Sequence, residues 1–394
     1  MARGLLRETA SLVQRGKLAS DEMRLRRPSG SQSFKRVFSL DVHQSVASDL
    51  ALGMPDSGID LLRWSISFHN FVNRRLLIAP DPVKHVNAYT WKALDENMID
   101  AFQDRYSSML KSFSGFLVCY PFAFAELFSG LDRPILAVSA TRYEVPYTLK
   151  HDQWLKLNGY LVDLHSKGLL HLAANNQGDA DYLEYFLGVR TDVVPSVCDY
   201  TDSVWSGKSN QRVVFSRIAG IEKDLLSRVG SNWRSSQQVF GRRFSWQRLS
   251  QVKEVFVLPY NISTMFLFEL ATAGIPVTVP SPHLYRRWIA SGLNPLSELS
   301  FFQLLEGSTA SLAADNPNNY RSASFYNWWL DRADFYDPVL MPNVRVVDSL
   351  DEAIDEPHPV TFMNMSSWRS IIRDRNSDLR SRRNALLSDF AGSL

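Results

Sequence analysis

Short apolar runs alternate with longer helical stretches from residue 34 onward, and this alternation constrains the fold more than any other feature. In the first half, runs rich in Val, Ile, Leu and Phe fit strands at residues 34–43, 59–69, 114–121, 133–142 and 169–176. Helical stretches separate them, at residues 45–52, 91–113, 122–130, 151–166 and 179–187. Strands that alternate with helices pair in parallel and are covered on both faces. The pattern therefore predicts an α/β fold.

The alternation begins again in the second half of the chain. Strands are predicted at residues 211–218, 254–260 and 275–281, and a short strand with a turn at 235–242. The chain has 394 residues, and at roughly 150 residues per domain this length favours two domains. We predict a basic extension at residues 1–33, a first Rossmann-like domain at 34–205, a second at 206–366, and a C-terminal helix at 367–394 that packs back on the first domain.

Composition excludes some classes of protein. The formal net charge is only +2, which argues against a dedicated nucleic-acid binder, although a predominance of arginine among the basic residues leaves an anionic ligand open. The two cysteines, Cys119 and Cys198, are too few for a disulfide framework and favour a reducing compartment. No run approaches the ~20 apolar residues of a membrane-spanning helix. We expect a cytoplasmic protein, with peripheral membrane contact or a transit peptide at residues 1–33 as open alternatives.

Residues 258–280, LPYNISTMFLFELATAGIPVTVP, form the most informative segment. It fits a strand, a loop, a helix that ends at Gly274, and a further strand. Ser263 and Thr264 lie at the predicted helix N-terminus, where hydroxyl and backbone N–H groups can bind a diphosphate. Glu269 lies almost two turns further on and could accept hydrogen bonds from ribose hydroxyls. An ordinary capped helix with Glu269 on a solvated face is the alternative.

This segment resembles the nucleotide-sugar motif of Leloir-type glycosyltransferases with the GT-B fold. In that motif a ribose-binding Glu precedes a small-x-x-Gly-x-Pro-Val pattern, which here reads Glu269 and then LATAGIPVTVP. The resemblance implies two Rossmann-like domains that face each other across a cleft, with Tyr260 and Asn261 in the donor site. Many retaining members carry an acid at the position of Asn261, so this departure puts a retaining mechanism in doubt.

A second segment, VVFSRIAGIEK at residues 213–223, resembles the first strand and loop of the GT-B donor domain. Arg217 and Lys223 take the positions of residues that grip the donor diphosphate, with Lys223 one residue beyond the commonest spacing. Charge-assisted contacts of this kind neutralise a leaving diphosphate without a metal. Surface charges at a helix start are the alternative. The resemblance thus implies a hexosyl- or pentosyltransferase that uses a nucleotide sugar such as a UDP- or GDP-sugar as co-substrate and no metal cofactor.

The first domain is then expected to bind the acceptor, which would be a glycan or a lipid- or protein-linked hydroxyl. Asp41 and His43 follow the first predicted strand and His69 ends the second, where α/β sheets place ligands. Histidine titrates near neutral pH and suits a general base, and we favour His43. Each histidine could instead be structural.

Further polar residues follow later strands of the same domain. Sugar-binding candidates are Arg142, Glu144, Asn175 and Asn176, with turn chemistry as the alternative for each. Asp179 and Asp181 form an Asp-x-Asp pattern, but they open a predicted helix, where acids are favoured by the dipole, so we expect no metal site there. Two other functions stay open: a nucleotide-sugar epimerase or hydrolase with the same fold, and a non-catalytic sugar- or nucleotide-binding protein.

Overall fold

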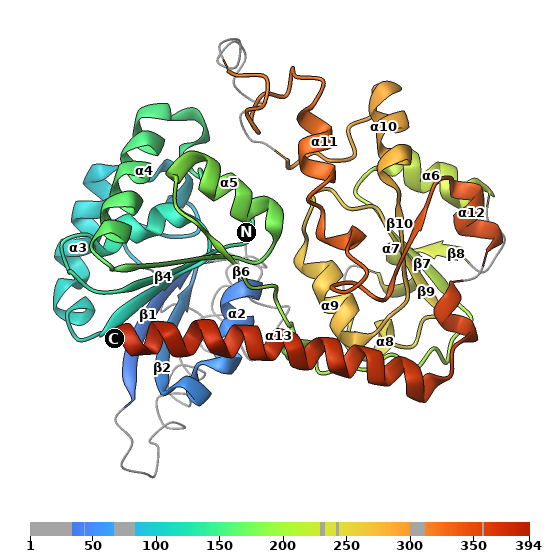
Figure 1. Ribbon diagram of the computed structural model, residues 1–394, viewed down its shortest axis with the longest axis horizontal. Coiled ribbons are helices and arrows are strands. Elements are labelled where there is room, and N and C mark those ends of the chain that lie inside the picture. Colours follow the sequence, from blue (N-terminus) through green and yellow to red (C-terminus); the bar gives the residue numbers. More distant parts are fainter. Residues whose placement is uncertain are drawn as a thin grey trace, which may run out of the picture.

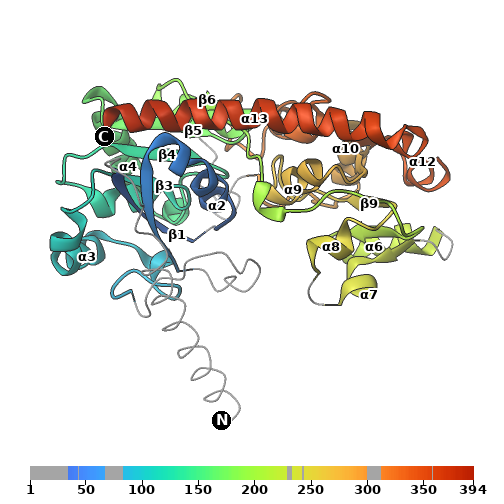
Figure 2. The ribbon, with the colours of Figure 1, turned by 90° about the horizontal axis from the view of Figure 1, so that it is seen from below.

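The computed structural model describes residues 34–42, 44–66, 83–228, 233–241, 244–299, 312–356 and 358–394. Two α/β units lie side by side, and one long helix runs along both of them (Figures 1 and 2). Each unit contains one parallel sheet. The prediction of an α/β fold with two Rossmann-like halves is therefore confirmed.

The first unit contains a six-stranded sheet in the order β2-β1-β3-β4-β5-β6. Its strands are β1 Lys35–Asp41, β2 Ile59–Ser65, β3 Gly115–Val118, β4 Ile135–Ser139, β5 Leu170–Ala174 and β6 Asp192–Val193. Its helices are α2 Gln44–Gly53, α3 Glu96–Leu110, α4 His151–Ser166 and α5 Gln177–Leu187. The region after β3, predicted as a short helix, forms a 3₁₀ segment at Phe122–Phe128.

The second unit contains a five-stranded sheet in the order β11-β10-β9-β7-β8. Its strands are β7 Arg212–Phe215, β8 Trp233–Ser235, β9 Glu254–Val257, β10 Val277–Pro280 and β11 Val344–Val347. Its helices are α6 Ala219–Arg228, α7 Ser236–Phe240, α8 Trp246–Leu249, α9 Met265–Ala273, α10 Pro282–Ala290, α11 Phe325–Leu330 and α12 Leu350–Asp355.

Both faces of the first sheet are covered, which explains why its strands read as nearly continuous apolar runs. Successive side chains of a strand point to opposite faces. Val37 of β1 packs in one cluster with residues of α2 and with Phe390 near the C-terminus. Its neighbour Phe38 belongs to the other cluster, with Phe102 of α3 and Leu157 of α4.

The prediction of a short strand at residues 235–242 is wrong. The strand there, β8, ends at Ser235, and the next residues form helix α7. Ser235 caps this helix by accepting a hydrogen bond from the backbone N–H of Gln238, while the Gln238 side chain accepts one from the backbone N–H of Ser235. This reciprocal capping box satisfies two backbone donors and favours a helix start.

The last helix, α13, spans Met365–Ser393 and extends from the second unit back to the first (Figure 2). At its start the indole N–H of Trp368 donates to the carbonyl oxygen of Gly274, 2.9 Å away, in the second unit. Near its end Lys35 of β1 donates to the carbonyl oxygen of Ala391, at 2.7 Å. In the described part of the chain, α13 and the other helices all lack an apolar stretch long enough to cross a bilayer.

Candidate functional site

The second sheet has a topological switch point between β7 and β9. Strand β7 pairs with β8 on one side and with β9 on the other, so the connections that follow these strands leave in opposite directions. In open α/β sheets, ligands bind beyond the carboxyl ends of the strands at such a point. Arg217 follows β7 and Tyr260 follows β9, so both predicted donor-binding residues lie at this edge.

Arg217 and Tyr260 are in direct contact. The guanidinium carbon of Arg217 lies 3.4 Å from the centroid of the Tyr260 ring. The same guanidinium donates a hydrogen bond to Glu298, at 2.9 Å, and the backbone N–H of Glu298 donates to the carbonyl oxygen of Tyr260, at 3.1 Å. The side chain of Arg217 stays 59% exposed. A preorganised cation thus stands at the switch point with one face open to water.

Helix α9 begins at the same edge. Its N-cap residue is Thr264, whose side chain makes no capping hydrogen bond, and Gly274, in the left-handed region at φ 69°, ends it. Ser263 and Thr264 are both buried, and the side-chain oxygen of Asn261 accepts from the backbone N–H of Ile262 at 2.8 Å. The positive end of the α9 dipole therefore lies beside the loop that carries Tyr260.

Glu269 lies on the half-buried side of α9 and faces the connection between the two units. Its carboxylate accepts a hydrogen bond from the hydroxyl of Tyr200, at 2.6 Å. Burial raises the pKa of Glu269 to about 7, and the Tyr200 hydrogen bond opposes that rise. The Glu269 charge also contributes to the raised pKa of Tyr260. Glu269 is thus part of the same electrostatic environment as Tyr260, and the alternative of a solvated face is wrong.

Lys223, the second predicted diphosphate ligand, lies on α6 and is exposed. Helix α6 starts two residues after Arg217, so both cations belong to the segment that leaves β7. The two cations differ in their surroundings. The Arg217 side chain contacts Tyr260 and Glu298, whereas the Lys223 side chain is exposed to solvent.

In the first unit the corresponding edge carries carboxyl groups. Asp41 ends β1 and is buried, and it accepts a hydrogen bond from the backbone N–H of Tyr120, at 3.2 Å. Burial raises the pKa of Tyr120, and Glu144, Glu298 and Asp41 add to that rise. Tyr120 therefore lies near carboxylates of both units. His43 and His69, the predicted bases, lie outside the described residues.

Glu144 follows β4 and is fully buried. Burial raises its pKa to about 7, while the charge of Arg142 lowers it. The carboxyl ends of β1, β3 and β4 thus bring Asp41, Tyr120 and Glu144 toward one region of the first unit.

Arg142, predicted to bind sugar, connects the two units instead. It is fully buried, forms an ion pair with Asp179 of α5, and donates to the carbonyl oxygen of Leu299 in the second unit, at 3.0 Å. Its guanidinium carbon lies 3.8 Å from the ring centroid of Trp329. Because Asp181 likewise pairs with Arg332 at 2.6 Å, both aspartates of the Asp-x-Asp pattern bind arginines. Among the described residues, no three His, Cys, Asp or Glu side chains lie together in a way that could hold a metal ion.

Asn175 and Asn176 lie at the start of α5, also between the units. Asn176 is the N-cap of the helix and accepts a hydrogen bond from the backbone N–H of Asp179, at 2.7 Å. The side-chain N–H of Asn175 donates to the sulfur of Met265 in the second unit, at 3.6 Å. Both asparagines are buried. The N-cap hydrogen bond of Asn176 fits the turn-chemistry alternative for that residue.

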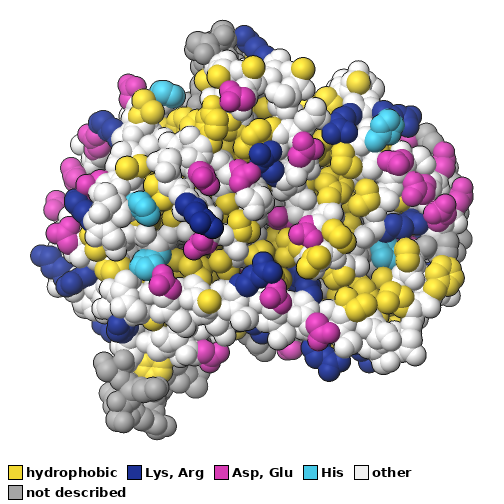
Figure 3. Space-filling model, in the orientation of Figure 1, with side chains coloured by type: hydrophobic (Ala, Val, Ile, Leu, Met, Phe, Trp, Pro, Cys, Tyr) yellow, Lys and Arg dark blue, Asp and Glu magenta, His cyan; other side chains and the backbone are white. Residues whose placement is uncertain are grey.

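Charged side chains are mixed over the surface seen in Figure 3. Basic and acidic side chains lie among one another across both units on this face and do not separate into regions of one sign. This distribution agrees with the small net charge of the chain.

Three residues of this region carried no signal in the sequence. Tyr120, Tyr200 and Glu298 lie in connections between strands and α-helices and belong to neither of the two motifs. Glu298 is 81 positions from its partner Arg217, and Tyr200 is 69 positions from Glu269. Pairings over such separations follow from the fold and not from local sequence.

Comparison with known proteins gives matches among solved structures alone. No family model matches the chain, and no curated protein matches it. The glycosyltransferase of kitacinnamycin superposes with a TM-score of 0.42 at 10% identity, covering 91% of this chain and 98% of that one. The calicheamicin glycosyltransferase gives 0.39 at 12% identity, with 91% and 97% covered. The spinosyn forosaminyltransferase gives 0.38 at 13% identity, with 77% and 96% covered.

Proposed function

We propose that this protein is a glycosyltransferase that moves a hexosyl or pentosyl group from a nucleotide diphosphate sugar to an acceptor hydroxyl. The observation that carries the proposal is the contact of Arg217 with Tyr260 at the switch point of the second sheet, next to the start of helix α9, which carries Glu269. A cation and an aromatic ring at the strand edge, with a carboxylate on the helix that follows, suit the three parts of a nucleotide, which are phosphate, base and ribose.

In this proposal Arg217 and the N-terminus of α9 neutralise the diphosphate as it leaves. A guanidinium forms short, charge-assisted hydrogen bonds to phosphate oxygens, and the backbone N–H groups of Ser263, Thr264 and the next residues supply partial positive charge. Lys223 contributes a further cation from α6. Stabilising the leaving group in this way is the main catalytic task when no metal takes part.

The acceptor would bind at the carboxyl edge of the first sheet, as a glycan or a lipid- or protein-linked hydroxyl. We propose His43 as the base that deprotonates this hydroxyl, with His69 as the second candidate. Asp41, two residues before His43 in the sequence, ends β1 and is buried, and we propose that it takes part in the same catalytic region. The buried thiols of Cys119 and Cys198 agree with the proposal that the protein works in the cytoplasm.

A thermal-shift screen with UDP-, GDP-, dTDP- and CMP-sugars, each with and without EDTA, tests the proposal. A ligand that binds only the folded state at 100 times its Kd adds about 2.7 kcal/mol to the free energy of unfolding. We expect one nucleotide to raise the melting temperature equally with and without EDTA. The protein would then be incubated with that donor and candidate acceptors. If free sugar forms without any acceptor product, the protein is a hydrolase, and if the donor is isomerised instead, it is an epimerase. If no donor stabilises the protein, the proposed nucleotide site is rejected.

A further inference from the structure

Tyr200 makes the direct hydrogen bond to the candidate ribose-binding carboxylate, although it belongs to neither sheet. It lies in the 3₁₀ turn Asp199–Thr201, in the connection between β6 and β7. Its hydroxyl lies 2.6 Å from a carboxylate oxygen of Glu269. We propose that Tyr200 is a positioning residue that orients the Glu269 carboxylate for the ribose of the nucleotide. This inference rests on the proposed nucleotide site.

The backbone around Tyr200 is fixed to the helix that carries Glu269. The side chain of Thr272, one turn after Glu269 on α9, donates to the carbonyl oxygen of Val197. The backbone N–H of Trp205 donates to the carbonyl oxygen of Ala273, at 2.7 Å. The connection therefore contacts α9 on both sides of Tyr200. These contacts fix the position from which the Tyr200 hydroxyl reaches Glu269.

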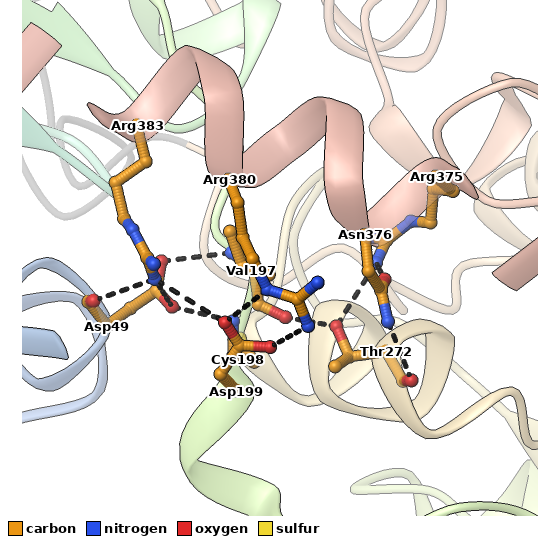
Figure 4. Close-up of polar contacts among 9 residues, drawn as sticks. All are labelled: Asp49, Val197, Cys198, Asp199, Thr272, Arg375, Asn376, Arg380 and Arg383. Atoms are coloured by element: carbon orange, nitrogen blue, oxygen red, sulfur yellow. Dashed lines mark hydrogen bonds and ion pairs between the residues drawn. The ribbon is translucent and has the colours of Figure 1, made fainter. Parts of the chain in front are cut away.

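The same connection is fixed to the first unit. The buried carboxylate of Asp49, on α2, accepts hydrogen bonds from the backbone N–H groups of Val197 and Cys198, at 2.9 and 2.7 Å (Figure 4). Arg380 of α13 donates to both carboxylate oxygens of Asp199, at 2.9 and 2.8 Å. Tyr200 thus has a backbone whose position is set by α2, α9 and α13 together, as a positioning residue requires.

The chemistry of the contact explains what Tyr200 contributes. An ionised carboxylate accepts hydrogen bonds at both oxygens, so Glu269 can hold the Tyr200 hydroxyl and still accept from ribose hydroxyls. A protonated carboxyl would lose part of that capacity. Burial favours the protonated form of Glu269 and the Tyr200 hydrogen bond favours the ionised form. Removing the hydroxyl therefore allows the Glu269 side chain to adopt other rotamers and makes its ionisation less favourable.

Other titratable groups lie near this contact. Cys198 of the connection is fully buried, burial raises the pKa of its thiol, and the thiol shares a hydrogen bond with the Tyr200 hydroxyl. Tyr260, from the loop after β9, has a pKa that is raised by burial and further by Glu269. Arg375 of α13 donates to the Thr272 hydroxyl, at 3.1 Å, on a later turn of α9. Among the described residues, Tyr200 is the one whose side chain donates a hydrogen bond to Glu269 itself.

The experiment is a calorimetric titration of UDP, GDP and dTDP into wild-type protein, Y200F, E269Q and the control Y160F between pH 6 and 8.5. Tyr160 is also half-buried, and its hydroxyl donates to a carbonyl oxygen in the first unit, at 3.4 Å, so Y160F loses the same atom elsewhere. The terminal phosphate of each nucleotide also titrates between pH 6 and 8.5. The pH dependence of binding to E269Q therefore measures the contribution that does not come from Glu269.

For the nucleotide that wild type binds most tightly, we expect affinity to increase with pH as Glu269 ionises. Y200F should bind the nucleotide about 3- to 10-fold more weakly at pH 7. The increase of its affinity with pH should occur at a higher pH than in wild type. Y160F should match wild type. If Y200F keeps the wild-type affinity and pH profile while E269Q loses affinity, the positioning role is overturned and the nucleotide site stands. If E269Q binds as wild type does, or no nucleotide binds, the site fails and the role of Tyr200 fails with it.

Discussion

At the scale of single residues, Glu269 is the side chain on which donor binding depends most. It is half-buried, and Tyr200 already donates to one of its oxygens. We predict that Glu269→Ala lowers donor affinity by about 1–3 kcal/mol, because ribose hydroxyls and the Tyr200 hydroxyl lose their partner. Calorimetry with the nucleotide found in the screen measures this change. Glu184→Ala, at an exposed position on α5, is the control, and equal affinities in both variants would remove Glu269 from the site.

Arg217 forms an ion pair with Glu298, and a diphosphate that binds there must compete for the same guanidinium. The two side chains are 59% and 38% exposed, so their attraction is weak, about 0–1 kcal/mol. We predict that Glu298→Gln raises nucleotide affinity by about two- to fivefold at low salt and less at high salt, where charges are screened. Glu96→Gln, which breaks the exposed pair with Lys156, should leave affinity unchanged. Weaker binding by Glu298→Gln would show that Glu298 assists the ligand.

His358 makes stability depend on pH. It is buried, with Nε2 3.2 Å from the carbonyl oxygen of Val277 and Nδ1 3.3 Å from the backbone N–H of Val360. Burial lowers its pKa to about 4, against about 6.5 in an unfolded chain. The unfolded chain therefore takes up a proton first as pH falls, and this residue's contribution, up to about 3 kcal/mol, is present above pH ~6.5 and lost toward pH ~4.

Urea unfolding of wild type and His358→Gln at pH 7 and pH 5 measures that contribution. We expect the difference in free energy of unfolding between the two proteins to shrink at pH 5, since only wild type loses stability through this imidazole. An equal difference at both pH values would contradict the buried, neutral state of His358.

Local sequence was sufficient to place residues that follow a strand or lie on the next helix, and their role in donor binding stays a prediction. Arg217, Tyr260 and Glu269 were predicted in this way, because each follows a strand or lies on the helix after it. Tyr200 and Glu298 could not be predicted, because their partners lie 69 and 81 positions away. Arg142 looked like a strand-end ligand, yet its guanidinium is covered by a ring from the other unit, which periodicity cannot reveal.

At the scale of elements, α13 holds the molecule together through arginines placed along one side. Arg383 reaches the buried Asp49 of α2 at 3.4 Å, Arg380 pairs with Asp199 of the connection, and Arg375 donates to Thr272 of α9 (Figure 4). Positions three to five residues apart fall on neighbouring turns of a helix, so one helix reaches three different parts of the chain.

We predict that Arg383→Met lowers the free energy of unfolding by about 3–5 kcal/mol, because it leaves the Asp49 carboxylate buried without its cation. Burial already raises the pKa of Asp49 and Arg383 opposes that rise. Arg382→Met, at the preceding residue, breaks the pair of Arg382 with Asp378, whose side chains are 51% and 56% exposed, and should cost less than about 1 kcal/mol. Urea unfolding of both variants measures the difference, and equal losses would contradict the buried ion pair.

Most strands and helices were predictable because their apolar residues repeat at the period of the element. The error at residues 235–242 arose where that signal is weak, since Ser, Gln and Gly outnumber apolar residues there. A serine followed three residues later by glutamine at Gln238 is the capping-box pattern, and it predicts the observed helix start better than the apolar residues predict a strand. Strand β11 was not predicted, and its sequence VRVV is short and lies among polar residues.

At the scale of the whole molecule, the two units meet through side chains from both. Tyr182 of α5 shares hydrogen bonds with Asn318, at 2.7 and 3.0 Å, and a side chain at position 178 would overlap the Ile262 side chain. Glycine at position 178 therefore permits the start of α5 to touch the loop that precedes α9. The candidate donor site lies next to this contact. We therefore expect nucleotide binding at α9 to change the solvent exposure of residues in both units.

Hydrogen–deuterium exchange with and without the nucleotide sugar that stabilises the protein is the measurement that tests the central claim most directly. The account predicts slower exchange in residues 216–220 and 258–269, which carry Arg217, Tyr260 and Glu269, with the outer edge strand β2 unchanged. Saturating nucleotide sugar that leaves both segments unprotected, or that protects the first unit alone, would contradict the claim that the β7–β9 edge and α9 bind the donor.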